Sequence, residues 1–290
     1  MGFVQRSEYV DLSETRVLKS PTFYFTGFHP DVVVQDNNGW AVRSAAGIYN
    51  SAITLYGFCK GLSPDETIRL FTEEVYYHLG FWNHWRVSRQ SVISDLDACW
   101  LPGEALFNSW SRQDRIFAYT PNHPKAMVCK SIVETLLKRH GLVNVDHDMG
   151  DGAPDILFYH GVWPIYPDVA LQTMGGAVRG SLDFCFKGEG WSMRDPYSLR
   201  EFVERSFDRY REQDVSFERI DILRNNKDIY HDLEALVDRP QDYRGNAFYG
   251  QLIRDKRSLS AKPLHRHDDA RIIAESNRAF KVVCDEELLA

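Results

Sequence analysis

Apolar positions along the chain alternate between strand-like runs and helix-like spacing, with polar, Gly-rich or Pro-rich breakers between them. Short strands are predicted at 22–25 and 32–34, on either side of a polar loop that contains a Gly and a Pro. Three helices are predicted next, over residues 48–59, 64–79 and 88–98. The aromatic and histidine-rich segment 81–85 is predicted to be a loop between the last two helices.

The pattern continues with strand, loop and helix in the middle of the chain. A strand at 116–119 leads through a breaker-rich loop at 120–124 into an apolar helical stripe over 128–137. A short strand at 156–159 and a short helix at 166–174 follow. These elements predict a second strand–loop–helix unit after the first hundred residues.

Two capping boxes mark helix starts. Ser63 with Glu66, and Ser198 with Glu201, have the spacing at which each side chain bonds the backbone amide of the other residue. The second box opens a helix whose apolar residues share one face. After this helix the signals weaken, and one late helix is predicted over 268–283.

Strand, polar loop and helix in succession is the arrangement that α/β enzymes use for their sites. The pattern therefore predicts an α/β fold: a helix-rich single main domain with a short, mostly parallel or mixed sheet, plus a C-terminal extension. We expect a polar N-terminal lead over residues 1–20, the α/β domain over 21–213, and an extension or small subdomain over 214–290.

Composition excludes several classes of protein. With 43% hydrophobic and 26% charged residues, the 290-residue chain can bury a core and is not of a disordered or low-complexity type. A net charge of −7 argues against nucleic acid as a partner. No apolar run is long enough for a membrane span. The five cysteines stand apart, without a CxxC pair, which favours reduced thiols and a cytoplasmic protein.

The familiar nucleotide, zinc-protease and hydrolase motifs are missing from the sequence, so two histidine loops are the candidates for chemistry. In the first loop, His29 could accept a proton and Asp31 could orient another group. The alternative is a turn shaped by Pro30, in which Asp31 bonds nearby backbone amides. The residues alone favour this turn.

The second loop precedes the helical stripe that begins near residue 128. Asn122 or His123 is expected to cap that helix, and its free N–H groups could then bind an anion, with Lys125 adding positive charge. Simple helix capping explains the same spacing without any ligand.

Metal binding and thiol chemistry are not predicted. His78 and His84 lack the spacing of a helical metal pair, and the histidine tract that starts at His265 is more typical of a solvated face. Cys59 and Cys129 lie inside apolar helical stripes, where a thiol behaves as a small buried hydrophobe.

Six segments occur together in a characteristic order. They are Phe-Thr-Gly-Phe-His-Pro-Asp at 25–31, Tyr-Asn-Ser at 49–51, Gly-Leu-Ser-Pro-Asp-Glu-Thr-Ile-Arg-Leu-Phe at 61–71, Tyr-Thr-Pro-Asn-His-Pro-Lys at 119–125, Trp-Pro-Ile-Tyr-Pro-Asp-Val-Ala at 163–170 and Leu-Arg-Glu-Phe-Val-Glu-Arg-Ser-Phe-Asp-Arg-Tyr at 199–210. In this order the chain resembles the WcbI-type capsular polysaccharide biosynthesis proteins over roughly residues 20–212. No segment is specific alone, but six in register are hard to obtain by chance.

The resemblance implies a coenzyme A-binding acetyltransferase that modifies a polysaccharide or its sugar precursor, built as an α/β domain with Cys/His chemistry. Two departures stand out. Family members typically open with a strand that ends in Gly-Asn-Cys-Gln, whose Cys is the expected nucleophile, and this sequence has no such segment. Asn50 stands where the family is expected to have His, and an amide cannot act as a base near neutral pH.

We therefore expect a CoA-dependent acetyltransferase that transfers the acetyl group of acetyl-CoA to a saccharide hydroxyl. His29 or His123 is the expected general base, with Asp31 as the orienting group. The expected cofactor contacts are Tyr49, Ser51, Asn122 and Lys125, with Asn122 and Lys125 placed against a phosphate of CoA or the acyl oxygen. Direct attack by the hydroxyl, assisted by a histidine, needs no cysteine.

Two other interpretations stay open. One is a non-catalytic module that binds CoA or a sugar nucleotide without turnover, left after loss of the nucleophile segment. The other is a scaffold of a glycan-assembly complex, in which both histidine loops are turns that share no pocket.

Overall fold

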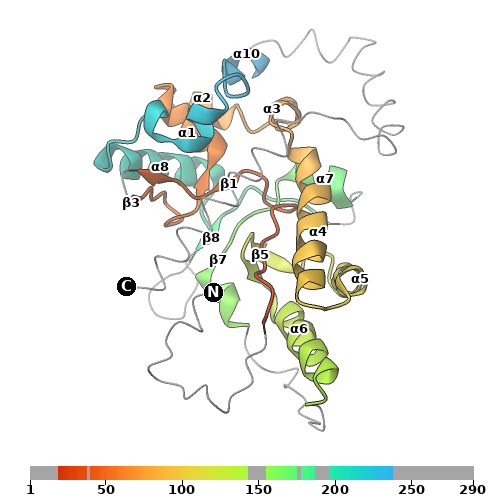
Figure 1. Cartoon of the computed structure of the whole chain (residues 1–290). Helices are drawn as coiled ribbons and strands as arrows, with labels where there is room; N and C mark the ends of the chain where they lie inside the picture. The colour runs from red at the N-terminus through yellow and green to blue at the C-terminus, as the bar shows by residue number, and fades with distance from the viewer. Residues whose placement is uncertain (1–18, 38–39, 143–154, 175–177, 187–195, 238–290) are drawn as a thin grey trace, which may run out of the picture.

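A computed structural model describes residues 19–37, 40–142, 155–174, 178–186 and 196–237 (Figure 1). The helices are α1 Ala52–Cys59, α2 Pro64–Ile68, α3 Glu73–His78, α4 Phe81–Ala98, α5 Gly103–Gln113, α6 Ala126–Arg139, α7 Pro167–Met174, α8 Leu199–Glu212, α9 Asp221–Asn225 and α10 Leu233–Val237, with two 3₁₀ helices, η2 Ile156–His160 and η3 Phe217–Arg219. No helix in these ranges combines the length and the apolar composition that a membrane span requires.

The strands are short and pair only locally. They are β1 Val32–Val33, β2 Asp36–Asn37, β3 Trp40–Ala41, β4 Asn50–Ser51, β5 Ala118–Thr120, β6 His123–Pro124, β7 Gly161–Val162 and β8 Cys185–Phe186. In the described residues they form four antiparallel pairs: β1 with β4, β2 with β3, β5 with β6, and β7 with β8.

The helix-rich α/β prediction is confirmed, but the pairing differs from the expected one. Where we expected a mostly parallel or mixed sheet, every described pair is antiparallel. Strands of two or three residues are too short for the ladder that a parallel sheet with crossover helices needs. Turns and helix caps bond most of the remaining backbone instead.

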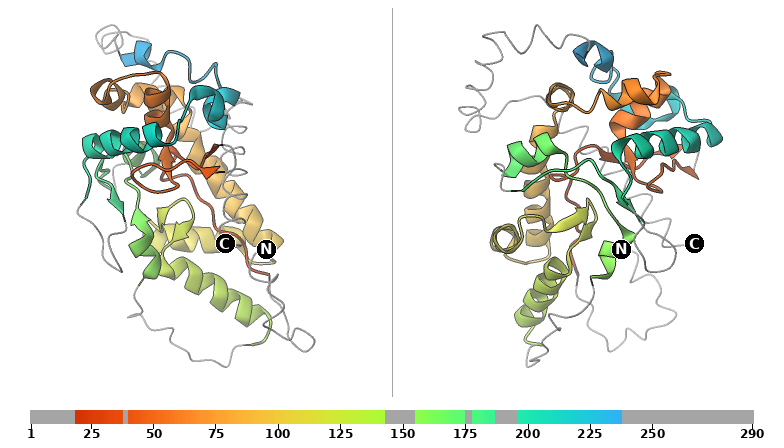
Figure 2. Two further views of the ribbon diagram at one scale, coloured as in Figure 1. Left: turned by 90° about the vertical axis from the view of Figure 1, so that its left-hand side faces the viewer. Right: turned by 180° about the vertical axis from the view of Figure 1, so that it is seen from behind.

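The helices gather in two groups with the strand pairs between them (Figures 1 and 2). Helices α1, α2 and α8 pack on one side, and α4, α5, α6 and α7 form the other side. Aromatic rings fill the core under the first histidine loop: Phe25 lies 5.1 Å from both Phe28 and Trp85, and Phe28 lies 4.9 Å from Phe117, as centroid distances. These edge-to-face contacts fix that loop against α4.

Local helix signals are largely confirmed. Ser63 and Ser198 each cap their helix in a complete capping box. The helix predicted over 64–79 is interrupted, because Thr72 caps a new helix by accepting a hydrogen bond from Val75. The predicted loop at 81–85 is wrong: these residues form the first turns of α4.

Other segments also differ from the prediction. The segment 22–25 does not pair as a strand. Helix α5 begins at Gly103, where we expected only the end of the preceding helix. The segment 156–159 lies in the 3₁₀ helix η2 and not in a strand. The short helix at 166–174 is confirmed as α7. The late helix predicted over 268–283 lies outside the described residues.

Residues 214–237, the described part of the predicted extension, pack onto the rest of the chain. The Ile222 amide donates to the Gln35 side chain at 3.2 Å, and the Leu233 amide donates to the Tyr56 hydroxyl at 3.1 Å. Six apolar residues of this segment are buried: Val215, Ile220, Ile222, Leu223, Tyr230 and Leu233. The division of the chain at residue 213 stays a prediction.

Helices α1 and α2 approach closely at Gly57. A Cβ atom at this position would lie 2.2 Å from the Thr67 hydroxyl oxygen, closer than real contacts allow. Gly57→Ala is therefore expected to lower the free energy of unfolding by about 1–3 kcal/mol through overpacking, although Ala alone would favour a helix by about 1 kcal/mol. Urea unfolding measures the change.

The double variant Gly57→Ala, Thr67→Ala is the control for this contact. It removes Thr67 Oγ1 and Cγ2, which would lie 2.2 and 2.6 Å from the new methyl group, and leaves Cβ at 2.9 Å, so it should recover part of the stability lost in Gly57→Ala. A Gly57→Ala variant as stable as the original protein would show that the helices do not depend on this close approach.

Candidate functional site

The two histidine loops lie next to each other. The Phe25 amide donates to the Pro121 carbonyl at 2.7 Å, which joins the approach to His29 with the turn between β5 and β6. On the other side, the Trp163 amide donates to the Tyr119 carbonyl at 2.9 Å. The fold therefore brings together segments that the sequence could not place relative to each other.

Asp31 lies at the N-terminus of α1. The pairing of β1 with β4 sets Val32 opposite Ser51, so the Asp31 side chain reaches the first turn of that helix. Its carboxylate accepts hydrogen bonds from the Ile53 amide at 3.1 Å and the Tyr166 hydroxyl at 2.7 Å, and the Ser51 side chain is a further partner. Burial raises the pKa of Asp31 to about 7, against the effect of these donors.

His29 is buried just before Asp31, with 2% of its surface exposed. Burial lowers the pKa of His29 to about 3, and a hydrogen bond to the Trp163 backbone opposes this only partly. The imidazole is therefore neutral near pH 7. Its Nδ1 has no hydrogen-bond partner among the described residues. His29 keeps a nitrogen that can accept a proton, but solvent does not reach it.

His123 occupies a more open position on β6. Its half-buried ring lies edge-on to Tyr49, with centroids 6.0 Å apart, and 5.4 Å from the ring of His160. Burial, and secondly the neighbouring His160, lower the pKa of His123 to about 4. Its Nδ1 is buried and also lacks a partner within the described chain, although the side chain as a whole is partly exposed. A neutral imidazole with an unused nitrogen can act as a base.

Asn122 lies beside His123 in the turn of the hairpin. The Tyr49 hydroxyl donates to Asn122 Oδ1 at 2.8 Å, and the Thr120 hydroxyl donates to the same oxygen at 3.0 Å. The predicted residues Tyr49, Asn122 and His123 thus form one cluster. Thr120 and His160 complete it. Sequence reasoning missed both, because Thr120 lies in the segment 119–125 without a distinct chemical signal and His160 belongs to none of the six segments.

The predicted capping of α6 by Asn122 or His123 is wrong. Lys125 is the N-cap residue and makes no side-chain cap bond. The Asp155 carboxylate accepts a hydrogen bond from the Ala126 amide at 2.8 Å, so the chain itself supplies the anion at this helix start. Lys125 pairs with Asp114. The anion site predicted at the helix terminus is therefore occupied by a carboxylate of this chain.

The described thiols are not activated, but the expected burial of Cys129 is wrong, because its side chain lies on the exposed face of α6. Burial raises the pKa of Cys59 to about 12, and it also raises the pKa of Cys129 and of Cys185. Cys99 is buried. Across the described ranges, no group of three or more His, Cys, Asp or Glu side chains is arranged to hold a metal ion.

A polar network lies behind the first loop. The Thr26 and Ser88 hydroxyl oxygens are 2.6 Å apart, and His84 Nδ1 lies 3.0 Å from the Thr26 oxygen. All three side chains are buried. Burial lowers the pKa of His84 to about 3. The network links α4 to the loop that carries His29.

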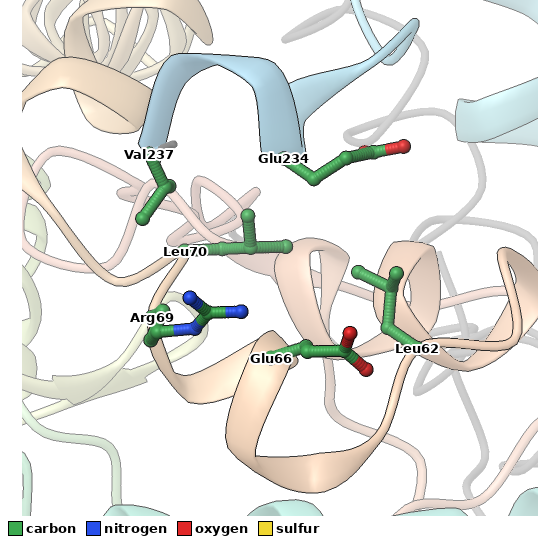
Figure 3. A pocket seen from close by; sticks show the side chains of 6 residues that line it. All are labelled: Leu62, Glu66, Arg69, Leu70, Glu234 and Val237. Atoms are coloured by element: carbon green, nitrogen blue, oxygen red, sulfur yellow. The ribbon is translucent and has the colours of Figure 1, made fainter. Parts of the chain in front are cut away.

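A pocket of about 100 Å³ lies elsewhere, between α2 and α10 (Figure 3). Its charged residues have partners within the chain: Glu66 accepts from Ser63 in the capping box, and Glu234 accepts from the Tyr56 hydroxyl. The lining residues are Leu62, Glu66, Arg69, Leu70, Glu234 and Val237. None of the predicted site residues lines this pocket. The candidate site is therefore the cluster of Tyr49, Thr120, Asn122, His123 and His160 at the β5–β6 hairpin.

Acidification is expected to destabilise the protein through its buried histidines. The folded-state pKa of His84 is about 3, against 6.5 for the ordinary value. The unfolded chain therefore binds more protons between these values, and stability present above about pH 6.5 is lost as the pH falls toward 3. Asp31 has the opposite effect, because its raised pKa favours the folded state below about pH 7.

Variants separate these contributions in urea unfolding at about pH 7 and about pH 5. His84→Gln should lose less stability between the two pH values than the original protein, since one titrating group is gone while Asp31 is unchanged. His231→Gln, at a side chain that is 70% exposed, is the matched control and should behave as the original protein. An unchanged loss in His84→Gln would contradict this account.

Comparisons with known proteins support the resemblance, and the family match covers the first four of the six segments. The model of the polysaccharide biosynthesis enzyme WcbI matches residues 10–144. Among solved structures, the fold is similar to that of WcbI, described as a novel polysaccharide biosynthesis enzyme, in its native form without a disulfide bond between coenzyme A and a cysteine. The TM-score is 0.53 at 13% identity, covering 76% of this chain and 70% of that chain. No curated protein matches the sequence. The chain is thus similar to the WcbI polysaccharide biosynthesis enzymes, in sequence over residues 10–144 and in fold.

Proposed function

We propose that this protein is a cytoplasmic, CoA-dependent acetyltransferase that modifies a saccharide hydroxyl in capsular polysaccharide biosynthesis. The WcbI match and the coenzyme A named for the neighbouring structure support the donor. The observation that carries the proposal is His123: an imidazole that is neutral near pH 7, whose Nδ1 is buried without a hydrogen-bond partner in the described chain, in a side chain that is partly exposed as a whole. Such a group is suited to take a proton from an acceptor hydroxyl.

In the proposed reaction, His123 takes the hydroxyl proton as the hydroxyl oxygen bonds to the thioester carbonyl carbon. The carbon–sulfur bond then breaks, and His123 returns the proton to the departing sulfur. The products are the acetyl ester and free CoA, and the histidine is regenerated. The route uses one imidazole nitrogen of His123 and forms no acyl-enzyme.

The other predicted residues divide into two groups. Asn122, Lys125 and Tyr49 are proposed to contact CoA or to support that contact. Lys125 keeps 23% of its side chain exposed despite its ion pair with Asp114. Ser51 is fully buried, where it caps α1 and bonds Asp31, so we assign it to the framework of the site.

Asp31 and His29 are proposed to position the residues of the site from the buried core. Asp31 fixes the start of α1, and β4 immediately precedes that helix. His29 bonds the backbone of Trp163, whose amide in turn holds Tyr119 of β5. Both buried residues therefore influence the position of the β5–β6 hairpin.

Turnover is expected to be independent of thiols. The raised pKa values of Cys129 and Cys185 leave little thiolate near pH 7. Treatment of the folded protein with iodoacetamide should leave the rate of acetyl-CoA consumption unchanged. The Cys129→Ala variant serves as the control for the exposed thiol. Inactivation that persists in this variant would indicate an essential cysteine elsewhere.

His123→Gln is expected to lower kcat about 100-fold or more, because general-base catalysis typically contributes about 10²–10⁴-fold. CoA binding measured by calorimetry should change little. Acetyl-CoA consumption is followed by release of free thiol, with methyl glycosides as probe acceptors. His231→Gln, at an exposed surface histidine, is the control and should retain full activity.

The alternative is the non-catalytic module that binds CoA or a sugar nucleotide. It predicts calorimetric binding of CoA without thiol release from acetyl-CoA, in the original protein as in His123→Gln. A protein that binds neither CoA nor acetyl-CoA would contradict the transferase proposal and the CoA-binding module together.

A further inference from the structure

The side chain of Asn122 is held by its oxygen atom. Oδ1 accepts from the hydroxyl of Tyr49, which is 9% exposed, and from that of Thr120, which is 2% exposed. An amide oxygen has two lone pairs, so these two bonds use its full accepting capacity. The orientation of the amide is therefore fixed by the hydroxyl group of Thr120 in β5 and by that of Tyr49, the residue before β4.

The amide nitrogen of Asn122 is left available. Its N–H groups donate to no residue in the described chain, and the Asn122 side chain is partly exposed. Asn50 provides the contrast within the same protein. Its nitrogen donates to the Val42 and Ile48 carbonyls, and its oxygen accepts from Tyr210, so the Asn50 amide is fully used in the core.

We propose that Asn122 Nδ2 donates a hydrogen bond to the acyl carbonyl oxygen of acetyl-CoA, and that Tyr49 and Thr120 are positioning residues for this amide. The inference rests on the proposed acetyltransferase function. Negative charge develops on the carbonyl oxygen as the acceptor hydroxyl bonds to its carbon, and it is lost when the carbon–sulfur bond breaks. A donor whose orientation is fixed in advance stabilises that charge without reorganising during the reaction.

The geometry favours a donor role over an acceptor role. If the amide oxygen faced the ligand, Asn122 could accept from the acceptor hydroxyl, but both lone pairs are already used by Tyr49 and Thr120. The available N–H groups match an oxygen acceptor, which is either the thioester carbonyl or a phosphate of CoA. The carbonyl is present in acetyl-CoA and absent from CoA, whereas both compounds carry the phosphates.

The ratio of the two affinities therefore tests the inference. Calorimetry measures the Kd of acetyl-CoA and of CoA for the original protein, Asn122→Asp, Tyr49→Phe and Thr120→Val. Asn122→Asp keeps acceptors for both hydroxyls but loses the donor, so it should weaken acetyl-CoA binding about tenfold more than CoA binding. Tyr49→Phe and Thr120→Val should each reduce the preference for acetyl-CoA about threefold, because the amide is then held by one hydroxyl.

Thr173→Val is the matched control. Its hydroxyl bonds the Val169 carbonyl within α7 and not Asn122, so both affinities should stay unchanged. Equal weakening of CoA and acetyl-CoA binding in Asn122→Asp would assign the amide to a phosphate and overturn the inference, as would unchanged binding. If Asn122→Asp fails to fold, Tyr49→Phe retains the aromatic ring and tests the same ratio. Failure of the original protein to bind either compound would instead overturn the proposed function.

Discussion

The buried carboxylate of Asp31 is the constraint on which the arrangement of the site depends. A carboxylate that is 0% exposed requires hydrogen-bond donors, because removing it from water without partners is costly. Its donors come from distant parts of the sequence: Ser51 at the end of β4, Ile53 in α1, and Tyr166 beside α7. The Asp31 side chain therefore connects β4 and α1 with the start of α7, and so links the two groups of helices.

The position of Tyr49 follows from that connection. Asp31 and Ser51 hold the end of β4, and the buried amide of Asn50 secures the same strand through Tyr210. Tyr49 then points toward the hairpin and bonds Asn122. A chain of polar contacts therefore runs from the buried core to the partly exposed cluster around His123. The Asn50 side chain uses its hydrogen-bonding groups in the core, where it contacts the Val42 and Ile48 carbonyls and the Tyr210 hydroxyl.

Local signals were predictable from the sequence, and contacts over long sequence separations were not. The capping boxes at Ser63 and Ser198 depend on residues three positions apart, so the sequence predicts them correctly. The loop predicted over 81–85 is wrong because aromatic residues are compatible with a loop and with a helix. In the structure, Trp85 packs against Phe25 and Phe28 from the first turns of α4, a contact that the sequence does not reveal. The motif residues Tyr49, Asn122 and His123 were found, but their common location depends on strand pairing and turns. The cap on α6 comes from Asp155, 29 residues further along the chain, and no local rule identifies it.

The cluster is built from neutral groups, and this bears on the kind of chemistry it supports. His123 is uncharged because burial lowers its pKa, Asn122 presents an amide, and the cation of Lys125 is offset by Asp114. Burying neutral groups costs less than burying charges, so the cluster can be held rigidly without ion pairs of its own. A neutral base and a neutral donor also suit a reaction whose charge appears only in the transition state, because neither binds an anionic ground state strongly. Acyl transfer from a thioester to a hydroxyl is such a reaction, whereas an activated thiolate would need nearby positive charge that the described cysteines lack.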